Sequence, residues 1–291
     1  MATEEQCGDA PDRRPVGGVD AFDALFVRIP IRDGETPAVR TVVREWVAAN
    51  RDGDARTVLP AAGVNHCTLF LDARGERNAL VWYVEVVDDD TPAWADPLAA
   101  VRESPLFDAG LADPVAEGAT VHADGVAGHQ LVVNASHPER QSWYGAVCDH
   151  SLVAPVAGDD LPIEVAMVAV PLRPGLVSWL TARLTRVANW LKRATPLGAA
   201  LRDQTAVLAE ERLYSESLLL EPRDGRQVLH YYMETESMTQ LYEGFEASDD
   251  WTARVGRWVL PRILARPEVM LDPPLESDYE VLFHAVDPNR G

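Results

Sequence analysis

Two short motifs of the sequence combine residue types that could carry out acid–base chemistry. Tyr83-x-Glu85 and Tyr232-x-Glu234 each place a phenol two residues before a carboxylate. Residues two apart point to the same face of a β-strand, so the two side chains of each motif would lie side by side. A carboxylate withdrawn from water is costly unless it is paired or hydrogen-bonded, so its occurrence in both motifs requires an explanation.

We consider one catalytic and one structural explanation. In the catalytic one, burial raises the pKa of a glutamate that acts as a general base, a tyrosine orients the substrate and a histidine assists. The candidates for these roles are Glu234, His230, Tyr232, Glu85 and Tyr83, with His284 as the candidate for cofactor binding. In the structural one, each glutamate pairs with an arginine such as Arg28 or Arg77, or lies in water at the edge of the fold. Perturbed carboxylates also occur in structural ion-pair networks, which favours the second explanation.

The two motifs belong to a longer internal repeat. Residues 69–85 align without a gap on residues 218–234, and the flanking blocks 30–34 and 129–140 align on 171–175 and 279–290. The identical pairs include Leu69/Leu218, Arg74/Arg223, Tyr83/Tyr232, Glu85/Glu234 and Arg140/Arg290. Three blocks in the same order indicate one duplicated domain.

Hydrophobic periodicity predicts the same elements in both copies. The first copy is expected to hold strands at 24–31, 64–71, 79–87 and 130–135 and helices at 36–51 and 96–107. The second is expected to hold a strand at 165–172, a helical region at 176–211, a hairpin at 214–235, helices at 238–245 and 251–264, and a strand at 280–285. The order βαββαβ is that of a ferredoxin-like unit, with strand order 4-1-3-2 and both helices on one face of the sheet.

The fold class predicted is therefore α+β, with two ferredoxin-like units whose antiparallel sheets stack as a pseudo-dimer within one chain, because an apolar sheet face is not left in water. The domain boundaries predicted are a disordered lead at 1–20, repeat 1 at 21–140, a linker at 141–162 and repeat 2 at 163–291. Period-two alternation directs Val81, Tyr83 and Glu85 to the space between the sheets.

Period-two alternation likewise directs His230, Tyr232 and Glu234 of the second copy to the space between the sheets. Asn134 and His284, on the fourth strands, are expected on the same side. His230 is expected beside Glu234, whereas Val81 stands at the matching position near Glu85. A ligand would then prefer the half that holds the second copy.

Two resemblances accompany this prediction. The stacked, duplicated units resemble the dimeric α+β barrel superfamily, with the dimer made covalently. The segments VPLRPG, VLAEERLYSESLLLE, LHYYMETES and FEASDD resemble a family of small acidic haloarchaeal and bacterial proteins of unknown function, which usually have one such domain. The second resemblance implies no activity or cofactor. The first implies, as an alternative to a small-molecule-binding or interaction protein, a barrel enzyme such as a monooxygenase, an isomerase or a haem-handling protein with its site between the sheets.

Composition limits the partners of the chain. The formal net charge is −20, and Lys192 is the one lysine among 26 basic residues. An acidic, lysine-poor surface is typical of a protein kept soluble in molar salt, so we expect a halophile's cytoplasm. Nucleic acid is not expected as a partner, because phosphate binding needs clustered basic residues. A small-molecule ligand and a homo-oligomer remain open.

Neither a membrane segment nor a metal site is predicted. The chain holds no apolar run long enough for a membrane span and no signal peptide at its start. Its three cysteines and seven histidines are scattered without the usual ligand spacings, so no metal is expected and the cofactor stays undetermined.

Overall fold

The fold is described from a computed structural model of the 291-residue chain. The residues that it describes are 22–50, 64–74, 77–87, 96–123, 129–137, 140, 152–153, 163–175, 183, 213–223, 225–248, 251–272, 277 and 279–286. The predicted lead at 1–20 lies outside these residues, as do the helical region at 176–211 apart from Arg183 and most of the predicted linker.

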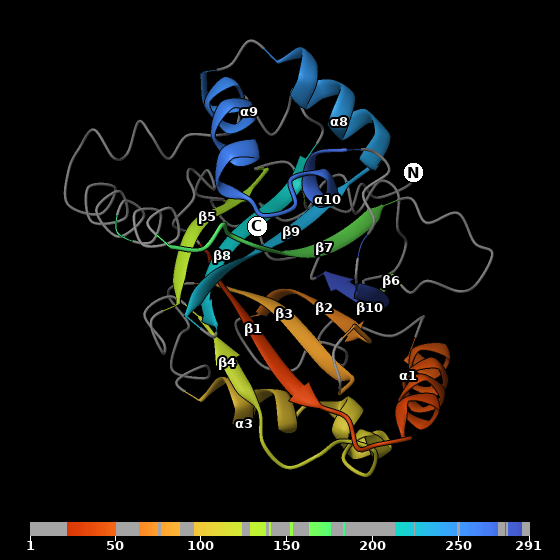
Figure 1. The fold of residues 1–291 in the computed structure, drawn as a ribbon. Coiled ribbons are helices and arrows are strands. Elements are labelled where there is room, and N and C mark those ends of the chain that lie inside the picture. Colours follow the sequence, from red (N-terminus) through yellow and green to blue (C-terminus); the bar gives the residue numbers. More distant parts are fainter. Residues whose placement is uncertain are drawn as a thin grey trace, which may run out of the picture.

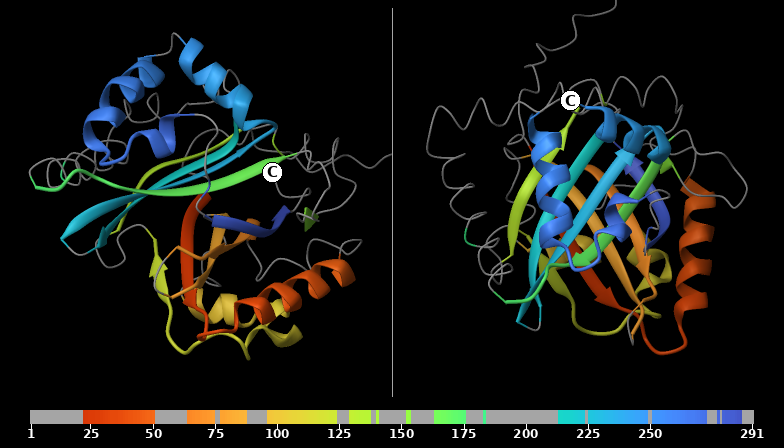
Figure 2. Two further views of the ribbon diagram at one scale, coloured as in Figure 1. Left: turned by 45° about the vertical axis from the view of Figure 1, so that its right-hand side comes forward. Right: turned by 45° about the horizontal axis from the view of Figure 1, so that its top comes forward.

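Two antiparallel sheets stack face to face between two layers of helices (Figures 1 and 2). The strands of the larger sheet follow the order β4-β1-β3-β2-β10-β6, and those of the smaller sheet follow the order β5-β8-β9-β7. The strands of the larger sheet are β1 (Phe22–Pro30), β2 (Val64–Asp72), β3 (Ala79–Val87), β4 (Thr120–His122), β6 (Leu152–Val153) and β10 (Tyr279–Val286). Those of the smaller sheet are β5 (Gln130–Ser136), β7 (Glu164–Pro171), β8 (Leu213–Arg223) and β9 (Arg226–Thr235). This arrangement is the predicted α+β fold of two stacked ferredoxin-like units.

Helices cover the outer face of each sheet. On the larger sheet lie α1 (Thr36–Asn50), α3 (Pro97–Arg102) and the single turn η2 (Phe107–Leu111), and on the smaller sheet lie α8 (Met238–Ala247), α9 (Trp251–Ile263) and α10 (Glu268–Leu271) (Figure 1). α1 buries Val39, Val43 and Trp46 at helical spacing. α3 begins where predicted, because the Asp96 side chain accepts a hydrogen bond of 3.0 Å from the backbone amide of Ala99. No helix among the described residues is long and apolar enough to span a membrane.

Alternation along the strands separates the core into layers. Leu80, Trp82 and Val84 of β3 pack against the helices, whereas Val81 and Tyr83 pack between the sheets. In β9, Leu229 and Met233 likewise face the helices while Tyr232 faces the other sheet. The orientation predicted from period two is therefore confirmed in both copies.

The predicted strand order 4-1-3-2 is wrong, because the fourth strands are exchanged. β5, from the first copy, pairs with β8 of the second, and β10, from the second copy, pairs with β2 of the first. The free edge of β1 is covered instead by β4, a short strand that the sequence did not indicate. An edge offers the same backbone donors and acceptors to any strand that reaches it, so local sequence does not select the partner.

Candidate functional site

A buried polar cluster occupies the centre of the space between the sheets. The rings of Tyr83 from β3 and Tyr232 from β9 stack there with centroids 3.7 Å apart and planes inclined by 16°. Glu85 and Glu234 follow them on the same strand faces, and both carboxylates are fully buried. The repeated motif therefore meets its own copy across the two sheets.

Arg140 joins the two glutamates. Its Nη1 donates to Glu85 Oε2 at 2.9 Å, and its Nε donates to Glu234 Oε1 at 3.0 Å. Its Nη2 donates to Glu234 Oε2 as well. The arginine partner expected in the structural explanation is thus present, but it is Arg140. Arg28 pairs elsewhere, with Asp72 at 2.9 Å.

Hydroxyl groups complete the shell of Glu85. The Tyr83 hydroxyl donates to Oε1 at 2.7 Å, the Ser215 hydroxyl donates to the same oxygen at 2.6 Å, and Ser136 donates to Oε2 at 3.4 Å. Glu234 receives a longer hydrogen bond of 3.3 Å from Tyr232. Buried carboxylates with this many donors are stable as anions.

The pKa values of both glutamates are lowered, whereas the catalytic explanation requires a raised pKa. Burial raises the pKa of Glu85, but the neighbouring His66 and Arg140 outweigh burial and lower the pKa below its ordinary range. At Glu234 burial is likewise outweighed, chiefly by Arg140, and the pKa is lowered. A carboxylate with a depressed pKa is a poor proton acceptor at neutral pH, which disfavours a general base at either position.

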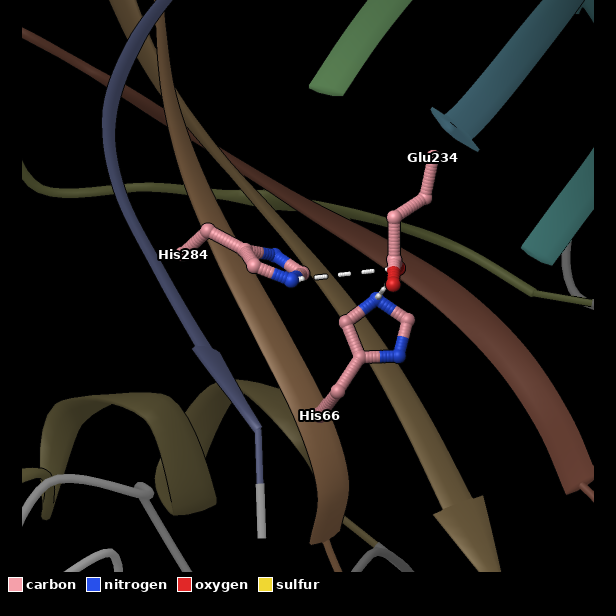
Figure 3. Close-up of side chains that lie close together, drawn as sticks. All are labelled: His66, Glu234 and His284. Atoms are coloured by element: carbon pink, nitrogen blue, oxygen red, sulfur yellow. Dashed lines mark ion pairs between the residues drawn. The ribbon is translucent and has the colours of Figure 1, made fainter. Parts of the chain in front are cut away.

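Two histidines lie beside Glu234 (Figure 3). His66 Nε2 is 3.9 Å and His284 Nε2 is 3.8 Å from Glu234 Oε2. His284 Nδ1 is 2.7 Å from the hydroxyl of Thr68, and burial lowers the pKa of His284 to about 3. Two imidazoles and a carboxylate could hold a metal ion by their spacing. However, the guanidinium of Arg140 already contacts the same oxygen of Glu234, so this place holds a cation of the protein itself.

His230 does not lie beside Glu234, which corrects the expectation from the sequence. Its Nε2 is 2.6 Å from Oε2 of Glu221, at the far end of the hairpin β8–β9. Glu85 is not without an imidazole either, since His66 Nδ1 is 3.0 Å from its Oε2. Single-strand counting misplaced these contacts because each imidazole meets a residue of another strand.

A second polar cluster surrounds His230 at one edge of the space between the sheets. We call His122, His129, Glu221 and His230 the rim cluster. His122 Nδ1 is 2.6 Å from His129 Nε2 and 3.8 Å from Glu221 Oε1. The four residues come from β4, from the residue preceding β5, from β8 and from β9, so both sheets contribute. All four are buried.

Arginines flank the rim cluster in a repeated pattern. Arg223 binds the carboxylate of Glu221 with Nη2 at 2.8 Å, and Arg74 binds the equivalent Asp72 with Nε at 3.1 Å. Arg28 binds Asp72 as well. Among the residues that the structure describes, the rim therefore carries three guanidinium groups against two carboxylates, within a chain of formal net charge −20.

A cavity of about 10 Å³ adjoins the rim cluster, and Arg28, Arg223, His122, His230 and Tyr279 belong to its lining. This volume is enough for one water molecule. The side chain of Arg223, one of the lining residues, is 46% exposed.

His122 and His230 of the rim cluster are neutral at physiological pH. Burial lowers the pKa of His122 to about 3, and it also lowers the pKa of His230. At Glu221 burial raises the pKa, but the hydrogen bond to His230 and the surrounding charges outweigh burial and bring the pKa to about 2. Neutral imidazoles beside an ionised carboxylate form a donor set that can bind a cation or position an anionic ligand.

Sequence reasoning missed several of these residues. His66, His122, His129 and Glu221 come from separate strands and share no motif spacing. For Arg140 a signal was present, because the repeat alignment already matched it with Arg290. An arginine repeated together with a buried glutamate was the available indication that the two would pair.

Comparison with models of known protein families gave no match, and comparison with curated proteins gave none either. Among solved structures, a candidate monooxygenase from Fusobacterium nucleatum aligns at 7% identity and a TM-score of 0.43, covering 91% of this chain and 92% of that one. A candidate monooxygenase from Lactobacillus acidophilus aligns at 8% identity and a TM-score of 0.40, covering 92% and 97%. An anthrone oxidase-like protein aligns at 8% identity and a TM-score of 0.34, covering 92% of both chains. TM-scores and identities this low carry no argument about function.

Proposed function

We propose that this protein binds a small anionic ligand, a carboxylate or a phosphate, at the rim cluster. The central cluster then serves as scaffold. Of the candidate residues named from the sequence, His230 belongs to the binding site in this proposal. The other five, Tyr83, Glu85, Tyr232, Glu234 and His284, hold the sheets together.

The observation that carries the proposal is the convergence at the rim of guanidinium groups in excess of carboxylates, beside neutral imidazoles and a small cavity. Arg28 and Arg223 both line that cavity. Guanidinium groups recognise carboxylate and phosphate through paired hydrogen bonds, which makes arginine suited to this class of ligand. Elsewhere on the chain the acidic excess repels anions, so the rim offers local attraction.

The size of the cavity indicates how the ligand would enter. A space of about 10 Å³ admits no organic molecule while Arg223 keeps its present position in the lining. Arg223 is half-exposed and can turn outward, releasing Glu221 and leading an oxyanion into the position that its guanidinium now fills. Arg223 would therefore give up its ion pair with Glu221 and form one with the ligand.

Thermal unfolding of chelator-treated protein at fixed potassium chloride tests this proposal. Phosphate, acetate and citrate serve as probes, and a ligand present at about 100 times its Kd should stabilise the fold by about 2.7 kcal/mol, which raises Tm by about 5 °C or more. R223Q should abolish the rise.

The matched control is R226Q, which removes the same charge from an exposed arginine on the same turn outside the cavity lining. R226Q should respond as the wild type does. No stabilisation of the wild type by any probe, or equal responses of the two variants, would contradict the proposal.

A further inference from the structure

The nitrogen and oxygen donors of the rim cluster converge on one point. The facing atoms of His122, His129 and Glu221 all lie within 4.8 Å of one another. They reach this point from three different strands or strand ends, and all three side chains are buried. Three donors brought together from distant parts of the chain form a compact set of the kind that first-row divalent metals occupy.

We propose that the rim cluster is a binding site for a divalent first-row metal ion, with His122 Nδ1, His129 Nε2 and Glu221 Oε1 as ligands. The inference rests on the proposed function in placing the ligand site at the rim, and it adds a metal as a component of that site.

The distances suit such an ion after a small adjustment. Bonds of about 2.05 Å in tetrahedral geometry separate ligand atoms by about 3.4 Å. The observed separations are 2.6 Å between the two imidazole nitrogens and 3.8 Å between His122 Nδ1 and Glu221 Oε1. The imidazoles would move apart by about 0.8 Å and the carboxylate would move inward by about 0.4 Å.

The surroundings of Glu221 also suit a metal ligand. His230 Nε2 donates to Oε2 at 2.6 Å and holds that side of the carboxylate. An outer hydrogen bond of this kind orients a ligating carboxylate. His230 is thus a positioning residue for the carboxylate of Glu221. Arg223 Nε donates to Oε1 at 3.1 Å, so this half-exposed arginine must turn outward, as in the proposed function, before Oε1 can bind a metal ion.

Three protein ligands leave at least one coordination position open. His122 borders the cavity that Arg28 and Arg223 also line, so the open position would face those guanidinium groups. An anion bound to the metal there would balance the positive charge of the ion and of the arginines. The two parts of the site would therefore bind metal and oxyanion together.

The central trio of His66, Glu234 and His284 offers the competing location, and it is the internal comparison for the test. Arg140, which binds Glu234 there, is buried, whereas Arg223, which binds Glu221 at the rim, is half-exposed and can turn away. The internal repeat suggests a conservative substitution for this trio. Asn134 of the first copy aligns with His284 of the second, so asparagine is accepted at this position of the unit. H284N should therefore fold and leave the rim unchanged.

Titration of the full-length, chelator-treated and untagged protein with Co²⁺ tests the inference, with Zn²⁺ used in competition. We expect one equivalent of Co²⁺ with the intense visible absorption of a four-coordinate ion. H129Q and H122N should each weaken binding by at least about 100-fold, and H284N should leave it unchanged. Circular dichroism establishes that each variant is folded.

If a rim variant does not fold, nuclear magnetic resonance of the wild type with Co²⁺ tests the site instead. Bound Co²⁺ should shift or broaden the imidazole proton resonances of His122 and His129 much more than those of His66 and His284. Absence of stoichiometric binding, or paramagnetic shifts centred on His66 and His284, would overturn the metal site. If phosphate still stabilises chelator-treated protein in that case, the proposed anion site stands without the metal.

Discussion

Replacing Arg140 with methionine is the sharpest test of how the two sheets are held together. The side chain keeps its approximate length but loses the guanidinium that now donates to both Glu85 and Glu234. Two buried carboxylates would then face each other without a cation between them. Removing one member of a buried ion-pair network typically costs about 3–5 kcal/mol, because the remaining charges stay desolvated. Against a total of about 5–15 kcal/mol for a typical domain, this is a large loss.

The pH dependence identifies the cause of that loss. In the wild type the pKa of each glutamate is lower in the folded chain than its ordinary value of 4.5, so this part of the stability is present above pH 4.5 and is lost as pH falls. Without Arg140, burial is no longer outweighed, and the pKa of at least one glutamate should rise above 4.5. Acidification would then favour the folded variant, so the difference between wild type and R140M should be largest near neutral pH and shrink towards pH 4.

Guanidinium unfolding followed by tryptophan fluorescence, from pH 4 to pH 8 at constant ionic strength, measures this difference. The double variant R140M/E85Q serves as control, because it removes one of the two opposed charges and should recover part of the stability at pH 7. A loss below about 1 kcal/mol at pH 7 would show that surrounding dipoles, not Arg140, stabilise the carboxylates. A loss independent of pH would attribute the effect to packing alone.

Three further outcomes are expected. Thermal stability should rise from low to molar potassium chloride, because salt screens the net charge of −20, and a flat or falling midpoint would remove the halophile interpretation. Y83F should destabilise more than Y232F in chemical unfolding, because hydrogen bonds to charged groups contribute most and the Tyr83 hydroxyl donates to its carboxylate at 2.7 Å. The closer partners of the Tyr232 hydroxyl are His66 and Thr68, at 2.9 and 3.0 Å, and its carboxylate is 3.3 Å away; equal losses would contradict this ranking. His284 has a folded pKa of about 3 against an ordinary value of 6.5, so it costs stability as pH falls from 6.5 towards 3, by up to about 1.4 kcal/mol per pH unit. H284N should flatten this part of the stability curve, and an unchanged slope would refute the assignment.

The helices and strands, and the sheet face to which each side chain points, could be predicted because they depend on local periodicity. Tyr83 and Tyr232 were placed between the sheets by counting in twos, and their stacked rings confirm that count. The partner of each outer strand could not be predicted, because a strand such as β5 carries no local mark of which edge it joins. His230 illustrates the same limit, since its face was predicted correctly and its neighbour was not.

The arginine and the rim cluster were missed for related reasons. Arg140 follows a strand and reaches the interior from its end, where period-two counting no longer applies. His122 lies in β4, a strand too short to leave a periodic signal, and His129 precedes β5. Residues that meet only through tertiary structure share no spacing that a single sequence displays.

The exchange of the fourth strands affects how the chain can fold while it is being translated. β10 is the last described strand to leave the ribosome, yet it pairs with β2, near the start of the chain. β5 is translated early and must wait for β8. The smaller sheet therefore cannot be completed before β9 has been made, and the larger sheet cannot be completed before β10 has been made. Until then the edges of β5 and β2 are open to other nascent chains. Pairings between such distant segments also form slowly. Ribosome-bound chains stalled before residue 279 should accordingly remain sensitive to protease in the larger sheet, and a fragment ending at residue 140 should not become a compact product.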